Sequence, residues 1–285
     1  MKLTVVLALV SVVTAAPRYE PIQLYYHEAV GIPEAARIRA AEEAIDFDGS
    51  RIVGGNAASL GQFPFLGGLV ITLASGGTSV CGSTLLTTTR LVTAAHCWFD
   101  GRQNARQLTV VLASLRLFSG GTRINTNQVE VHASYNPSNL HNDVAVIRIS
   151  AVGLSNNINT IPLASGSSNY VGQTAQAAGF GRTGDNVGIS QNQILSHVSL
   201  PVIANAECQR TFGGIVIAST LCTSGANGRS TCGGDSGGPL RIGNSLVSLW
   251  IVGIVSFGAS AGCQRGFPAG FARVTSFQSW IRQRL

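Results

Sequence analysis

Short β-rich segments separated by glycine-containing turns run through most of the chain, and they restrict its fold more than any other feature. Four examples are FLGGLVITLA (65–74), QLTVVLASLRLF (107–118), DVAVIRIS (143–150) and SLWIVGIVSF (248–257). Strands this short and this regularly spaced favour a barrel or a sandwich. The 34 glycines and the low proportion of charged residues (11%) point the same way. We therefore expect an all-β architecture.

Two segments have helical patterns instead. PEAARIRAAEEAI (33–45) predicts a short helix, with too little apolar surface to fold alone. At the other end, apolar residues recur at helical spacing in SFQSWIRQRL (276–285), which predicts a terminal helix packed on the body through Phe277, Trp280, Ile281 and Leu285.

Residues 1–16 have the pattern of a secretory signal peptide. A lysine is followed by the apolar run LTVVLALVSVV and the small residues TAA, which predicts cleavage after Ala15 or Ala16. The apolar run is too short for a retained transmembrane helix, and no later stretch reaches that length. We expect a secreted, extracellular protein with no membrane partner.

Six cysteines all lie beyond Ile52. In an oxidising compartment an even number predicts three disulfides, although spacing alone leaves fifteen connectivities open. A zinc site needs ligand pairs two to four residues apart, and no two of these cysteines have that spacing. The cysteines are Cys81, Cys97, Cys208, Cys222, Cys232 and Cys263.

Charge divides the chain at the same place. Residues 17–51 hold seven acidic residues and four arginines, a net charge of −3, whereas residues 52–285 hold fourteen arginines and six acidic residues, a net charge of +8. The arginines of the basic part are scattered singly, without a cluster or a basic helix, which argues against a nucleic-acid partner.

The basic part contains no lysine, because the single lysine of the chain is Lys2. Drift or codon bias is one explanation. The other is an alkaline working medium, in which lysine becomes partly neutral while arginine stays charged.

Three further residues form a chemical set. His96 stands in VTAAHCW, Asp143 in HNDVAVIRI, and Ser236 among the glycines of STCGGDSGGPL. Separately they could be a packed histidine, a strand cap and a turn. Together they could activate a nucleophile, since a serine hydroxyl needs an imidazole to take its proton and the imidazole needs a carboxylate to orient it. The backbone N–H groups of Gly234 and Ser236 could then bind an oxyanion.

These motifs resemble the trypsin–chymotrypsin family of serine proteases, and most closely the secreted digestive chymotrypsins of insect larval gut. The resemblance rests on TAAHC (93–97), NDVAV (142–146), GDSGGP (234–239) and RIVGG (51–55). It implies two antiparallel six-stranded β-barrels with a C-terminal helix, an N-terminal barrel over about 52–165, and a C-terminal barrel with the helix over about 166–285.

The resemblance also assigns roles. His96 is the general base and then acid, Asp143 orients it, Ser236 is the nucleophile, and Gly234 and Ser236 donate to the oxyanion. The implied disulfides are Cys81–Cys97, Cys208–Cys222 and Cys232–Cys263. No cofactor is implied. The calcium loop of this family is rich in acidic residues, whereas residues 110–128 contain none, so the resemblance predicts no calcium site.

Specificity follows from three pocket residues that the resemblance assigns: Ser230 at the base, and Gly258 and Ala269 in the walls. An uncharged base disfavours arginine and lysine, and the open wall at Gly258 favours Phe, Tyr and Leu. The methyl group of Ala269 narrows the pocket. Elastase-like or collagenase-like specificity is the alternative.

The segment RIVGG predicts a zymogen. A cut after Arg51 would release residues 17–51 as a propeptide, since no cysteine precedes Ile52, and by resemblance the new amine of Ile52 pairs with Asp235. A serine-based pocket would not cut after Arg51, so a separate trypsin-like activator is expected. The other expected partners are protein and peptide substrates and protein protease inhibitors, and the enzyme is expected to be a monomer in the gut lumen.

Two rival functions remain. A catalytically silent homologue acting as a binding protein would usually lack one of the three catalytic residues, and all three are present here. A regulatory protease of a cascade would usually carry a recognition module ahead of its propeptide, and none is apparent in the sequence.

Overall fold

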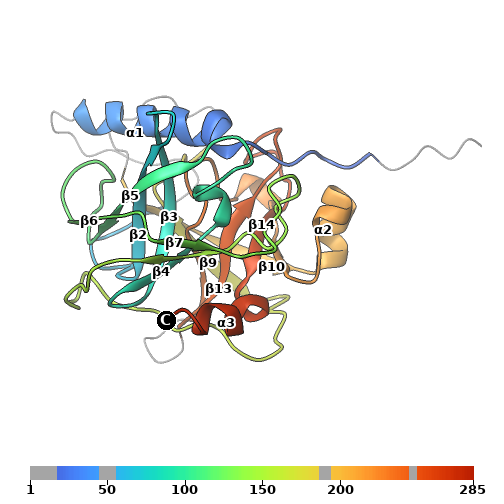
Figure 1. The fold of residues 1–285 in the computed structure, drawn as a ribbon. Helices are drawn as coiled ribbons and strands as arrows, with labels where there is room; N and C mark the ends of the chain where they lie inside the picture. Colours follow the sequence, from blue (N-terminus) through green and yellow to red (C-terminus); the bar gives the residue numbers. More distant parts are fainter. Residues whose placement is uncertain (1–17, 45–55, 186–193, 244–248) are drawn as a thin grey trace, which may run out of the picture.

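The computed structural model of the chain describes residues 18–44, 56–185, 194–243 and 249–285. The predicted signal peptide, Arg51 and Ile52 lie outside these ranges. Two curved antiparallel sheets pack against each other, and α1 lies across one end of the first sheet (Figure 1). The prediction of a mostly β fold with a C-terminal helix is confirmed.

The first sheet has seven strands in the order β6-β5-β2-β3-β4-β8-β7. No pairing between its edge strands β6 and β7 is found among the described residues, so in its hydrogen bonding it is a half-barrel instead of the closed barrel that was expected. The chain itself joins these two edges across residues 127–128. The strands are β2 (Leu66–Leu73), β3 (Thr78–Thr87), β4 (Arg90–Thr93), β5 (Ala105–Leu112), β6 (Thr122–Thr126), β7 (Val129–Val131) and β8 (Ala145–Arg148).

The second sheet closes into a six-stranded barrel, because β9 pairs with both β12 and β10. A short seventh strand, β1, adds to the outer side of β10. The strands are β1 (Asn56–Ala57), β9 (Thr174–Gly179), β10 (Ser196–Ile203), β11 (Thr220–Thr223), β12 (Pro239–Ile242), β13 (Trp250–Phe257) and β14 (Ala269–Arg273).

Strand β3 is buried along nearly its whole length, although TSVCGSTLLT mixes apolar and small polar residues. Val80 and Leu85 are fully buried. The segment that leads into α1 (Ile32–Glu43) and the second sheet also pack against the strand: Ser79 lies against Gly31, and Gly82 lies against Gly238. Because side chains alternate along a strand, Ser79 and Gly82 point to opposite faces. A strand covered on both sides does not need the alternation typical of a half-exposed strand.

The two predicted helices are present. The first begins as one turn of π-helix (His27–Gly31) and continues as α1, whose Ile38 and Ala41 are buried against the body. In α3 (Val274–Arg282) Phe277 and Ile281 are buried as expected. The expectation for Leu285 was wrong: it lies beyond the helix and is 41% exposed.

The remaining helices of the described residues were not predicted from the sequence. They are α2 (Asn205–Phe212) and three short 3-10 turns, Ala95–Cys97, Gly213–Ile215 and Ala226–Gly228. Within the described part of the chain, no helix has the length and apolar character needed to cross a membrane.

The two sheets meet closely at Gly82 of β3. Its N–H donates a hydrogen bond to the carbonyl oxygen of Ser236 (2.7 Å). A Cβ atom at this position would lie 2.8 Å from the Cα of Gly238 and 2.9 Å from its nitrogen. Both neighbours are backbone atoms, so they cannot move aside as a flexible side chain could. Gly82 is therefore required for the two halves to approach this closely.

We expect Gly82→Ala to destabilise the protein by about 1–3 kcal/mol, the usual cost of forcing an extra carbon into a packed site. Gly153→Ala is the matched control, because a Cβ atom there would meet nothing within 4 Å. Urea unfolding of the oxidised full-length chain measures both. Equal unfolding midpoints for the two variants would contradict the assignment of Gly82 to a tight joint.

Candidate active site

The three disulfides bring distant segments together. They join Cys81 to Cys97, Cys208 to Cys222 and Cys232 to Cys263, which are the pairs that the resemblance implies. The first links β3 to the turn that carries His96. Because Cys81 and Cys97 are bonded to each other, their sulfur atoms are not thiolates available to a metal beside that histidine.

His96 lies in the 3-10 turn that follows β4, and its side chain is 2% exposed. Its Nδ1 is 2.7 Å from Oδ2 of Asp143, and its backbone N–H donates to Oδ1 of the same carboxylate (2.9 Å). With Nδ1 donating its proton to the carboxylate, Nε2 becomes the basic nitrogen. Nε2 is buried and has no hydrogen-bond partner among the described residues.

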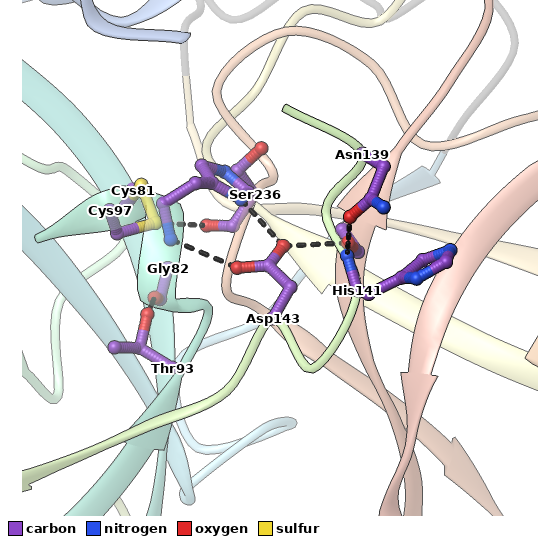
Figure 2. Close-up of polar contacts among 10 residues, drawn as sticks. Cys81, Gly82, Thr93, Cys97, Asn139, His141, Asp143 and Ser236 are labelled. Atoms are coloured by element: carbon purple, nitrogen blue, oxygen red, sulfur yellow. Dashed lines mark hydrogen bonds and ion pairs between the residues drawn. A yellow bond between two sulfur atoms is a disulfide. The ribbon is translucent and has the colours of Figure 1, made fainter. Parts of the chain in front are cut away.

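Asp143 stands just before β8, at the end of a turn. Figure 2 shows this turn, in which the N–H of His141 donates to Oδ1 of Asn139 (3.0 Å). The hydroxyl of Ser256, in β13, donates a third hydrogen bond to Asp143, to Oδ2 at 2.6 Å. Ser256 was not singled out in the sequence. An ordinary serine two residues before Gly258 has no distinguishing local pattern, and only the packing of the two sheets brings it to Asp143.

Ser236 lies in the glycine-rich turn before β12 and is 9% exposed. Its carbonyl oxygen is fixed by Gly82, and Sγ of Cys97 lies 3.7 Å from the same oxygen as a contact (Figure 2). Two glycines in the turn have left-handed backbone conformations, Gly234 (φ +99°) and Gly237 (φ +79°), which other residues rarely adopt. The turn thus keeps Ser236 beside the residue that follows His96.

Asp235 is held by two backbone amides. The N–H of Gly181 donates to Oδ1 (2.9 Å) and the N–H of Cys232 donates to Oδ2 (3.0 Å). Burial and the negative charge of Glu34 raise the pKa of this carboxyl, the two amides and Arg37 lower it, and the resulting pKa is about 6. The predicted partner, Ile52, lies outside the described residues.

A cavity of about 230 Å³ adjoins Ser236. Two of the three predicted pocket residues, Ser230 and Gly258, line it together with Phe257. The lining reaches Pro268, the residue before Ala269, and Ala269 itself is buried at the start of β14. The predicted base, Ser230, is uncharged, and the carboxylate in the lining belongs to Asp185.

The family model described as Trypsin matches residues 52–281. The chain belongs to the trypsin family. It is therefore a serine peptidase, with peptides or proteins as substrates.

Several relatives in this family come from arthropods. The chain is 35% identical to a collagenase of Hypoderma lineatum, over 82% of this chain and 86% of that protein. It is 37% identical to brachyurin of Leptuca pugilator (81% and 97% covered) and 36% identical to serine protease 1 of Drosophila melanogaster (81% and 84%). The solved structure of HL collagenase superimposes with a TM-score of 0.74 at 35% identity, covering 82% of this chain and 98% of that one. The fold is thus the chymotrypsin fold of the family.

The raised pKa of Asp235 predicts a pH effect on the uncut chain. A carboxyl with a folded pKa of about 6 and an unfolded pKa of 3.8 binds more protons when folded, so its contribution to stability is lost as the pH rises from about 4 to about 6. The loss amounts to about 3 kcal/mol. We expect Asp235→Asn to gain that much stability relative to the wild type between about pH 4 and pH 7.

Urea unfolding of both chains at the two pH values measures this change. The comparison of the two chains is needed because His27 titrates in the same pH range and changes the stability in the opposite direction. Burial lowers its pKa to about 4, so its contribution is lost as the pH falls. Subtracting the two chains cancels His27. A stability difference that stays constant with pH would contradict the assignment to Asp235.

Proposed function

We propose that the chain is the zymogen of a secreted chymotrypsin-like serine endopeptidase that cleaves after Phe, Tyr or Leu. The observation that carries this proposal is the buried His96–Asp143 pair, with the basic nitrogen of His96 left unpartnered beside the Ser236 turn. The order of the three residues along the chain and the family membership support the same assignment.

In this mechanism, Oγ of Ser236 attacks the carbonyl carbon of the scissile bond and its proton passes to Nε2 of His96. Asp143 stabilises the imidazolium, and the N–H groups of Gly234 and Ser236 hold the oxyanion. The proton then passes to the leaving amine as the C–N bond breaks, which leaves an ester on Ser236. Water hydrolyses that ester by the same route in reverse, and the serine is regenerated.

The lining of the cavity beside Ser236 supports the preference for apolar residues. Ser230, Gly258 and Phe257 line it, and the predicted base, Ser230, is uncharged. The carboxylate in the lining, Asp185, already accepts hydrogen bonds from the N–H groups of Cys263 and Gln264, so a guanidinium at Ser230 would have no carboxylate of its own. Collagenase-like specificity is a second candidate, supported by the similarity to proteins named collagenase and brachyurin. Cleavage of native collagen by the activated enzyme would favour this second candidate.

The substrate preference is tested on the chain cut after Arg51 with trypsin and repurified. We expect kcat/KM for peptides with Phe or Leu before the scissile bond to exceed that for Arg by at least about 100-fold. An organophosphate should label Ser236 in the cut chain, and Ser236→Ala should abolish both labelling and turnover. A preference for Arg would overturn the pocket assignment. A failure to label would favour a binding protein instead.

We further propose a digestive role in an alkaline gut, supported by the absence of lysine after residue 2. We expect kcat/KM to stay near its maximum at about pH 9, with the upper limit set by the Ile52 amine, whose pairing with Asp235 weakens as it loses its proton. A pH–activity profile that peaks near about pH 7 and collapses by about pH 9 would contradict this role.

A second measurement separates digestion from a signalling cascade. Turnover of many denatured proteins would favour digestion, whereas one discrete cleavage would favour a signalling cascade.

A further inference from the structure

Residues 21–43 of the predicted propeptide lie in the cleft that holds the candidate active site. At the start of this segment, Ile22 forms an antiparallel bridge with Ala259. The N–H of Gln23 donates to the carbonyl oxygen of Gly258 (3.2 Å), and the N–H of Ser260 donates to that of Pro21 (2.9 Å). The segment is thus hydrogen-bonded to a wall of the cavity beside Ser236, as an added strand.

Tyr26 occupies the centre of the cleft. Its side chain is 7% exposed, its ring centroid lies 4.8 Å from that of His96, and its hydroxyl donates to the carbonyl oxygen of Val80 (2.8 Å). Burial raises the pKa of the phenol, while interactions with the Ser236 side chain and the Gly234 backbone oppose the rise. The phenol therefore fills the space between the imidazole and the proposed oxyanion donors, where a substrate carbonyl would have to lie.

The backbone beside Tyr26 does not have the extended form of a cleavable substrate. Tyr25 has a left-handed conformation (φ +55°), and its carbonyl oxygen accepts a hydrogen bond from the N–H of Ala29 (3.1 Å). The chain from His27 onward is helical. Because this carbonyl is already engaged inside the segment, Tyr25–Tyr26 does not present itself as a scissile bond.

The helical part is fixed to the body at its first turn. The N–H of His27 donates to Oδ2 of Asp100 (2.8 Å), and its Nδ1 lies 2.9 Å from Oγ of Ser79. Gly31 lies so close to β3 that a Cβ atom there would be 1.9 Å from Oγ of Ser79 and 3.2 Å from its Cβ. Rotation of the Ser79 hydroxyl away from such a group would break its contact with His27.

Glu34 carries the buried charge of the segment. Its side chain is fully buried and forms ion pairs with Arg37 in the same helix (2.8 Å) and with Arg182 of the body. The N–H of Arg182 donates to the carbonyl oxygen of Gly233, the residue before Gly234 (2.8 Å). An acidic group buried without such a partner would be strongly destabilising. Glu34 and Arg182 therefore anchor the helix next to the oxyanion-forming turn.

The far end of α1 is held by Glu42. Its carboxylate accepts hydrogen bonds from the N–H groups of Leu117 (2.5 Å) and Phe118 (3.0 Å). Each contact described above joins the segment either to itself or to a residue at or beyond Ser79. Cutting the chain after Arg51 leaves each of these contacting groups intact. The propeptide is acidic and residues 52–285 are basic, so their net charges also attract each other.

We propose that residues 21–43 are an inhibitory ligand of the protein's own catalytic cleft, which binds there in competition with substrates even after the cut at Arg51. The inference rests on the proposed peptidase function and adds a regulation to it. With no disulfide to residues 52–285, the segment leaves on dilution and returns at high concentration. The cut alone would then not give full activity until the propeptide is diluted or degraded.

The test uses a synthetic peptide of residues 18–44 and the cut, repurified enzyme. We expect it to raise KM for a small Phe or Leu substrate without changing kcat, with an inhibition constant on the order of 1 μM or tighter. Fluorescence anisotropy of the labelled peptide measures binding directly. No inhibition and no binding at about 100 μM peptide would overturn the inference.

Variant peptides test the geometry. Tyr26→Ala and Glu34→Gln should each weaken binding by about tenfold or more, since each removes a buried central contact. Glu43→Gln is the matched control for the second, because Glu43 is the exposed last residue of α1 and should bind like the wild type. Gly31→Ala should bind more weakly although alanine makes the free peptide more helical, which excludes helicity as the cause.

The two measurements separate the two proposals. Turnover by the cut enzyme without inhibition or binding by the peptide would overturn this inference and leave the peptidase function standing. Binding of the peptide to a cut protein without turnover would support the cleft contacts and overturn the peptidase function. Equal binding by the Tyr26→Ala, Glu34→Gln and Glu43→Gln peptides would also overturn the inference, because the occupied site would then not be the one described here.

Discussion

The backbone contact between the two sheets at Gly82 and Gly238 is the constraint on which the candidate site depends. Because neither residue has a side chain, the carbonyl oxygen of Ser236 can reach the N–H of Gly82 at 2.7 Å. The disulfide from Cys81 to Cys97 fixes the His96 turn to the same strand. The turns that carry His96 and Ser236 are therefore tied to neighbouring residues of β3, one by the disulfide and the other by a backbone hydrogen bond.

Three buried carboxylates near this joint are stabilised in different ways. Asp143 has His96 and Ser256, and Glu34 has Arg37 and Arg182. Asp235 has two amides and no directly bonded cation among the described residues, and burial raises its pKa to about 6. A cation brought to Asp235 would offset the cost of burying this carboxylate, and we expect the new amine at Ile52 to be that cation.

Much of the fold could be predicted because its signals are local. Short β-rich segments, turn glycines and the helical spacing of Phe277 and Ile281 each act within a few residues. Local signals do not predict that the second sheet closes into a barrel while the first remains a half-barrel, because closure depends on which edge strands pair. For the same reason α2 and Ser256 were missed: neither has a local pattern that distinguishes it from its neighbours.

The sequence by itself identified the family and the six disulfide-forming cysteines, and it predicts a boundary at Arg51–Ile52, because each of these depends on residue types at fixed spacing. Only the tertiary structure decided where the acidic segment before that boundary lies. Its helix was predicted as too polar to fold alone, and it is ordered by contacts with residues far along the chain, from Ser79 to Ser260. Such contacts depend on the shape of the assembled cleft, which no short stretch of the sequence encodes.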